Sequence, residues 1–91
     1  MKILKEILLD STVITPQTVY TPKNSEVVDV YLSGTNIKIL VLTDPNETDF
    51  QLKTFKICTK DENIYFDAVK YIGTFETDLG KWFLIEIERS N

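Results

Sequence analysis

Apolar and polar residues alternate along most of this chain, and turn-favouring residues interrupt the alternation roughly every eight to twelve positions. This spacing is typical of short antiparallel strands. The pattern predicts strands over residues 17–20, 26–33, 37–43, 50–59, 70–77 and 81–88. The run 37–43 is apolar at nearly every position, which indicates a strand that is central in its sheet.

The segment 2–9 fits two patterns. Ile3, Ile7 and Leu8 would line one face of a helix. Ile3, Ile7 and Leu9 would instead share one face of a strand. We expect a strand, because the chain is rich in strand-forming side chains, with 10 Ile, 7 Val and 11 Thr against a single Ala. Six to seven short strands predict one all-β domain over 1–91, a small antiparallel β-sandwich or barrel.

Glycines mark two features of this sheet structure. Gly34 lies in the segment 33–36, where it supplies the permissive backbone that a hairpin turn needs. Gly73 lies inside a predicted strand, where a glycine usually marks a bulge or the close approach of another backbone. Further turns are predicted at 44–47 and 78–80.

The last predicted strand has apolar residues on both faces. We expect Phe83, Ile85 and Ile87 to point into the core. Trp82 and Leu84 would then share the outer, partly covered face with the glutamates of this strand. Trp82 is interpreted either as a core aromatic or, together with Leu84, as the centre of an oligomer interface. Because the first strand and the edge strands also leave apolar surface, a homo-oligomer is predicted.

Composition narrows the classes of function. The net charge of −4 argues against direct nucleic-acid binding, which needs a basic surface. Cys58 is the only cysteine, so no intrachain disulfide is possible. Lys5 and Glu6 interrupt the first apolar run, which makes it too short and too charged for a signal peptide or a membrane span. A cytoplasmic protein without a membrane partner is expected.

The residue types needed for most enzyme mechanisms are missing. The sequence has no histidine, which excludes Ser-His and Cys-His nucleophile pairs and nearly all zinc-hydrolase ligand sets. Its three glycines are far apart and form no phosphate-binding loop. The acidic clusters near 44–49 and 61–67 lack the spacing of a calcium loop, so we interpret them as solvated turns. Lys60 could lower the pKa of the Cys58 thiol, but a small buried side chain is the more common role. We therefore predict no enzyme, no cofactor and no metal.

The longest polar stretch, 60–67, contains an apolar cluster that includes Tyr65 and Phe66. With Lys60 and Lys70 nearby, these aromatics could stack on a base and pair with a phosphate. They could equally anchor a protein partner, because aromatic side chains often dominate binding energy. The alternative is a structural role in which they cap the open end of the sheet.

Several short motifs occur in the order found in a family of small uncharacterised phage and prophage proteins, a domain of unknown function, which this chain resembles. The most distinctive is a Tyr-Ile/Val-Gly-Thr-Phe motif near the C-terminus. The matching segments are 21–22, 40–45, 55–57, 71–75 and 83–86. The Gly-Thr-Gly-His-like loop of the family is absent, and Cys58-Thr59-Lys60-Asp61 stands in its place. The resemblance implies a phage or prophage origin and a compact β-fold, and it supplies no activity.

These observations lead to a hypothesis about function. We expect a non-enzymatic accessory protein that counters host defence in the cytoplasm of the host cell. It would inhibit a host defence protein by occlusion, or it would sequester a small nucleotide ligand used as a signal. The alternative is a minor virion or assembly component.

Overall fold

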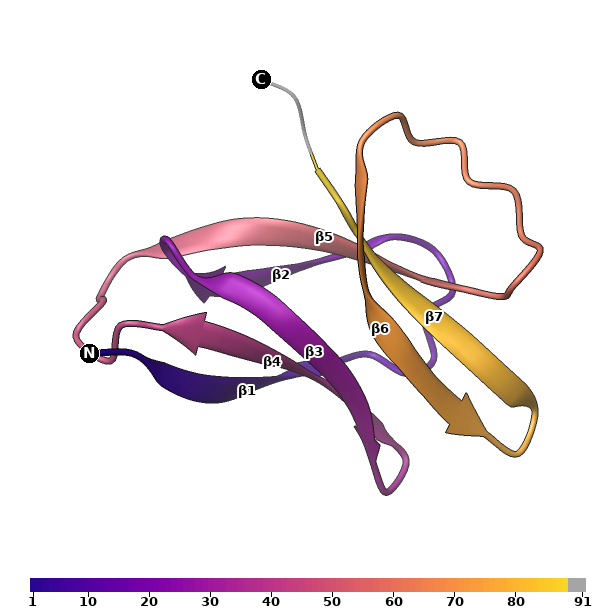
Figure 1. The fold of residues 1–91 in the computed structure, drawn as a ribbon, viewed down its shortest axis with the longest axis horizontal. Coiled ribbons are helices and arrows are strands. Elements are labelled where there is room, and N and C mark those ends of the chain that lie inside the picture. Colours follow the sequence, from indigo (N-terminus) through magenta and orange to yellow (C-terminus); the bar gives the residue numbers. More distant parts are fainter. Residues whose placement is uncertain (89–91) are drawn as a thin grey trace.

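The computed structural model describes residues 1–88, and over these residues the chain forms seven antiparallel strands in two sheets (Figure 1). The strands are β1 (Ile3–Leu9), β2 (Gln17–Pro22), β3 (Glu26–Ser33), β4 (Asn36–Thr43), β5 (Phe50–Cys58), β6 (Val69–Thr77) and β7 (Gly80–Ile87). The predicted all-β sandwich is confirmed, and the two sheets do not close into a barrel. The segment 2–9 is a strand, as expected. None of the elements within 1–88 is a helix long and apolar enough to cross a membrane.

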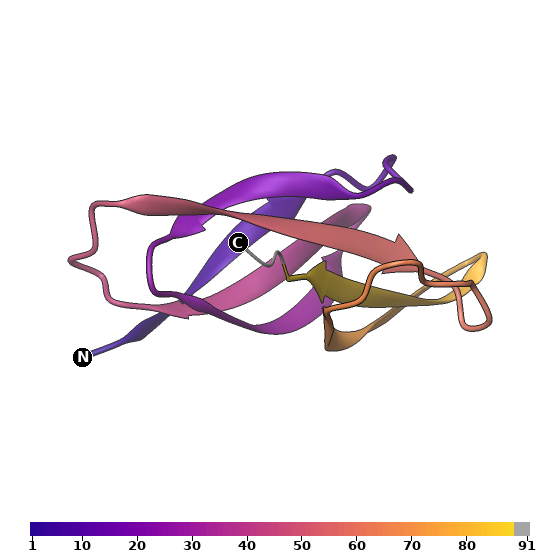
Figure 2. The same cartoon turned by 90° about the horizontal axis from the view of Figure 1, so that it is seen from above.

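Each sheet draws its strands from distant parts of the chain. Sheet A has the order β1-β4-β3, and sheet B has the order β2-β5-β7-β6. The predicted central strand is confirmed as β4, because Ile39 lies opposite Ile7 of β1 on one side and Val30 of β3 on the other. The sheets are seen from above in Figure 2. The order explains the apolar run in β4, since a central strand has neighbours on both edges and apolar side chains on both faces.

The core lies between the two sheets. From sheet A it takes alternate residues of β4, namely Ile37, Ile39 and Val41. From sheet B it takes side chains such as Phe55 and Leu84, which are fully buried. Alternation along each strand therefore places one apolar row of each sheet against the other, which is the arrangement that defines a sandwich.

Two β-bulges lie on the neighbouring strands β3 and β6. The register of β3 shifts between Val27 and Asp29, and that of β6 shifts between Tyr71 and Gly73. A Cβ atom at Gly73 would lie 3.1 Å from the Val30 Cγ1 atom, so the Val30 side chain would have to shift to admit a larger residue. The bulge predicted at Gly73 is confirmed, whereas the close neighbour is a side chain, since the Val30 backbone N atom would lie 3.8 Å from the added Cβ. The first bulge also leaves Val28 exposed, because an extra residue reverses the alternation of a strand.

The expected faces of β7 are wrong. Leu84 is fully buried in the core, Trp82 is partly buried against it, and Ile85 lies on the opposite face of the sheet. Leu84 is therefore unavailable for an oligomer interface on this surface. Ile85 is nevertheless buried, and so is Cys58, which shares that outer face because it pairs with Phe83.

A buried ion pair explains the reversal on β7. We expected Glu86 to point to solvent, which would have placed Leu84 outside. Instead Glu86 shares the inner face with Phe55, its partner in the register, and is only 8% exposed. The Nζ atom of Lys53 lies 3.3 Å from its Oε2 atom. A carboxylate that is hydrogen-bonded and paired in this way tolerates burial that an isolated one would not.

The predicted turns are confirmed. Gly34 has φ +64°, and with Thr35 it forms a two-residue hairpin loop between the paired residues Ser33 and Asn36. At Asp44 the side chain accepts a hydrogen bond of 2.9 Å from the backbone N–H of Asn46, a common way to begin a turn.

Candidate functional site

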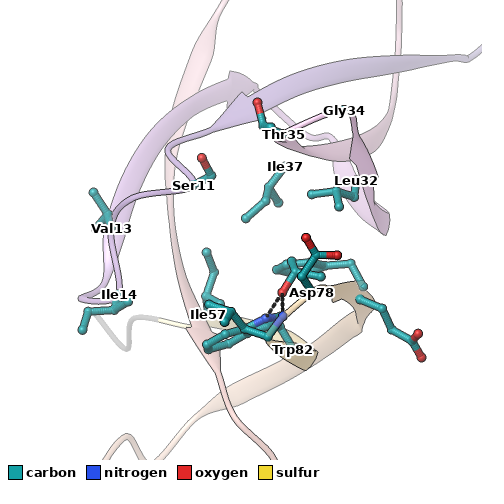
Figure 3. Close-up of a pocket in the computed structure, with 14 residues that line it drawn as sticks. Ser11, Val13, Ile14, Leu32, Gly34, Thr35, Ile37, Ile57, Asp78 and Trp82 are labelled. Atoms are coloured by element: carbon teal, nitrogen blue, oxygen red, sulfur yellow. Dashed lines mark hydrogen bonds between the residues drawn. The ribbon is translucent and has the colours of Figure 1, made fainter.

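A cleft of about 700 Å³ opens at one end of the sandwich, where three connections meet (Figure 3). The β1–β2 connection contributes Ser11, Val13 and Ile14 on one side. The β3–β4 hairpin, with Gly34 and Thr35, forms the second side. The β6–β7 hairpin, with Asp78 and Leu79, forms the third. Its size is within the usual range of small-molecule and side-chain binding pockets.

The cleft is mainly apolar. Its walls include the core residues Ile37, Ile57 and Phe75, so it is a continuation of the core to the surface. At the rim, Ile14 is 71% exposed and Leu79 is 87% exposed. Apolar side chains that flank a concave apolar surface favour a partner that buries them.

Trp82 lies against the wall of the cleft and is held by a hydrogen bond. Its indole Nε1–H donates to the Thr77 Oγ1 atom at 2.9 Å, and the backbone N–H of Leu79 donates to the same oxygen at 3.2 Å (Figure 3). The two-residue turn between Thr77 and Gly80 brings these groups together. Because the indole N–H is satisfied within the protein, the rest of the ring is left for apolar contact.

The charged residues that line the cleft are both acidic. They are Glu76 and Asp78, on the β6–β7 hairpin, and within residues 1–88 no lysine or arginine lines the cleft. A phosphate group would meet repulsion here, whereas an apolar group that carries a positive charge would be attracted. The cleft therefore has the chemistry to bind an uncharged or basic ligand.

The loop between β5 and β6, residues 59–68, is the segment in which sequence patterns placed a binding site. It forms the wide arc beside β6 in Figure 1. It begins with a turn in which the Glu62 carboxylate accepts a hydrogen bond of 3.3 Å from the Thr59 N–H and pairs with the Lys56 ammonium group. The hydrogen bond from Lys56 is the main cause of a lowered pKa of Glu62. The start of the loop is thus fixed to the outer face of sheet B.

The predicted binding residues lie on the loop and on the strand that follows it. Tyr65 is 85% exposed, Phe66 is 38% exposed, and Lys60 is exposed. Lys70 lies on β6, where its Nζ atom is 3.6 Å from the Glu26 Oε1 atom of β3. Among the residues described, no hydrogen bond or ion pair joins any two of the four predicted side chains. Lys70 instead forms an ion pair that links β6 of sheet B to β3 of sheet A.

The thiol of Cys58 is buried, and burial is the main cause of its raised pKa. Lys56 opposes this effect, and the Glu62 carboxylate adds to it. A raised pKa keeps the thiol protonated and unreactive, so the structural interpretation of Cys58 is favoured. Within residues 1–88, no three acidic or cysteine side chains converge as metal ligands would.

Sequence patterns singled out Trp82 but missed the cleft in which it lies. The lining comes from three connections that are far apart in the chain, so no local motif marks it. The one local feature of the sequence that points to the cleft is a tryptophan three residues after an exposed Asp-Leu turn. Comparison with protein-family profiles, with curated proteins and with solved structures gave no match to the chain.

Proposed function

We propose that this chain is a non-enzymatic accessory binding protein of phage or prophage origin that inhibits a host immune protein by occlusion in the host cytoplasm. The origin rests on the resemblance of the segment 71–75 and its companions to the phage family. The observation that carries the binding role is the apolar cleft with its exposed rim residues Ile14 and Leu79. Removing such an apolar surface from water lowers the free energy, so binding of a partner that covers it is favourable.

The charges of the cleft favour one kind of partner. Asp78 and Glu76 would attract a lysine or arginine that neighbours an apolar side chain on the partner surface. The same carboxylates disfavour a nucleotide, whose phosphates are negative, so a protein target is preferred over a sequestered nucleotide signal. The exposed Tyr65 on the loop 59–68 is a separate candidate contact outside the cleft, because tyrosine is enriched among residues that dominate binding.

A plating assay tests this function. The protein is expressed in bacteria that each carry one defence system, and the strains are challenged with a phage sensitive to that system. We expect plating to be restored on at least one host and to be lost with Leu79→Ser. The matched control is Leu52→Ser, which alters an exposed leucine of β5 outside the cleft. Unchanged plating on every defended host would refute the proposal.

Trp82 allows a direct test of the cleft, because it is the only tryptophan. Its fluorescence should shift to the blue when a Leu-Lys-Leu peptide is added, since the ring moves into a drier environment. ATP should cause no shift. A shift with ATP alone would favour the sequestered nucleotide signal instead.

The second candidate is a minor virion or assembly component. The exposed edge of β1 favours it, because strand addition is a common way to join small β-domains. Mass spectrometry of purified particles distinguishes the two: stoichiometric copies in the particle support assembly, and their absence rejects it.

A further inference from the structure

β1 is an edge strand that is exposed on both faces. Among the strands described, it pairs with β4 alone. Leu4 and Leu8, on the outer face, are 57% and 58% exposed, and Ile3 on the inner face is 42% exposed. Only Leu9 is buried. Edge strands are usually protected by proline, by a bulge, by short length or by charged side chains. This strand of seven residues has no proline and no bulge. Its charged residues are Lys5 on the inner face and Glu6, which is paired with Lys38.

The sequence of β1 is symmetric about Glu6 in its pattern of apolar residues. In an antiparallel contact between two copies, residue i faces residue j and residue j faces residue i. With Glu6 on the two-fold axis, all seven residues of the strand find a partner, and each exposed leucine of the outer face meets a leucine. The facing pairs are Ile3 with Leu9, Leu4 with Leu8, and Lys5 with Ile7.

The charge on the proposed axis is neutralised within each copy. The Glu6 Oε2 atom lies 3.1 Å from the Lys38 Nζ atom, and Tyr31 also hydrogen-bonds to the carboxylate. Two glutamates that face each other are therefore accompanied by two lysines. The neighbouring registers are worse, because one brings two copies of Lys5 together and the other sets Leu4 against Asp10.

We propose that a second copy of this chain pairs with β1 in antiparallel register, with Glu6 on the two-fold axis, to form one continuous six-stranded sheet from two copies of sheet A. The interface differs from the one expected at Trp82 and Leu84. It is also independent of the cleft, because no residue of β1 lines it. The dimer and the proposed function can therefore fail separately.

Light scattering and native mass spectrometry test the association. We expect twice the mass of one 10.5 kDa chain at high concentration, falling to one chain on dilution. The double substitution Leu4→Lys with Leu8→Lys should give the mass of one chain at every concentration. The control carries Leu52→Lys with Tyr65→Lys, which alter side chains elsewhere that are at least as exposed, and it should remain dimeric. A wild type with the mass of one chain, or a dimer that survives the β1 lysines, would overturn the proposal.

A single cysteine tests the register. Glu6→Cys places two thiols opposite each other on the axis, so mild oxidation should link nearly all of the protein as dimers that a reductant separates. Leu4→Cys and Leu8→Cys alone should link at least about tenfold more slowly, because their facing residues are leucines. Cys58 does not compete, since it is buried. Circular dichroism verifies that each variant is folded. Equal rates for Glu6→Cys and Leu4→Cys would overturn the assigned register.

Discussion

The two sides of the sandwich are built differently. On one side, β3 and β6 pack against each other, their bulges lie on neighbouring strands, and Lys70 of one sheet pairs with Glu26 of the other. On the other side, β1 and β2 make at most marginal contact over the described residues, and most of β1 is exposed. The two sheets of this thin domain are therefore packed together along β3 and β6. On the opposite side, β1 presents an exposed edge that another strand can contact.

The largest expected effect comes from opening the closed side. Gly73→Val would force a branched side chain against Val30, whose Cγ1 atom already lies 3.1 Å from the position of a Cβ. Overpacking of this kind should lower the free energy of unfolding by about 3 kcal/mol. Denaturant unfolding measures the change. Thr74→Val, the next residue on β6, is the control and should stay within about 0.5 kcal/mol. Equal losses would mean that the contact between β3 and β6 is unimportant.

A smaller loss is expected from the ion pair between the two central strands of sheet B, β5 and β7. Glu86→Ala leaves Lys53 without its carboxylate, which should cost about 2 kcal/mol in unfolding experiments. Glu88→Ala removes an exposed carboxylate and should cost little. The double variant Lys53→Met with Glu86→Leu should recover most of the stability, because an apolar pair replaces two charges. A double variant as unstable as Glu86→Ala would contradict this account.

On the open side, neighbouring leucines should differ. Leu8→Ala removes an exposed side chain and should change the unfolding free energy of the dilute monomer by at most about 0.5 kcal/mol. Leu9→Ala, the internal reference, removes a buried side chain and should cost about 3 kcal/mol. Thermal unfolding at low protein concentration gives both values. Similar losses would show that β1 is covered on its outer face even in the monomer.

The smallest effect concerns the polar contacts that hold β1 to its sheet. The hydrogen bond to Glu6 is the main cause that raises the pKa of Tyr31 to about 12 from an ordinary value of 10.0. The stabilisation is therefore complete below pH 10 and is lost as the pH rises through about 12. Glu6→Gln should return the Tyr31 pKa toward its ordinary value. The absorbance of the tyrosinate ion, with Tyr31→Phe to assign the signal, measures the titration. A pKa that does not respond to Glu6→Gln would rule out the hydrogen bond as its cause.

Local patterns predicted the strands and the turns well, because alternation and turn residues act over a few positions. The strand 37–43 and the Gly34 hairpin lie where the pattern placed them. Which face points inward was harder to predict. Val28 departs from simple alternation because a bulge shifts the register of β3, and Leu84 was misplaced because Glu86 is buried with Lys53. Both depend on residues of another strand.

The candidate site was the least predictable part. Tyr65 and Phe66 stand out in the sequence because they interrupt a polar stretch, yet no hydrogen bond or ion pair among the described residues joins them to Lys60 or Lys70. The cleft around Trp82 depends on how β1–β2, β3–β4 and β6–β7 meet in space. The strand order of the two sheets brings these three connections together, and local alternation of apolar and polar residues does not encode that order.

The pairing of β1 with β4 has a consequence for synthesis. Ile7 has its partner in the register at Ile39, and the whole β2–β3 segment lies between them. A ribosome that adds 5–20 residues a second needs about 2–6 s to cover this interval. During this time β1 lacks its native partner strand β4. Under the dimer proposed above, the β1 strands of neighbouring nascent chains on a polysome can pair during this interval, before either chain has finished folding.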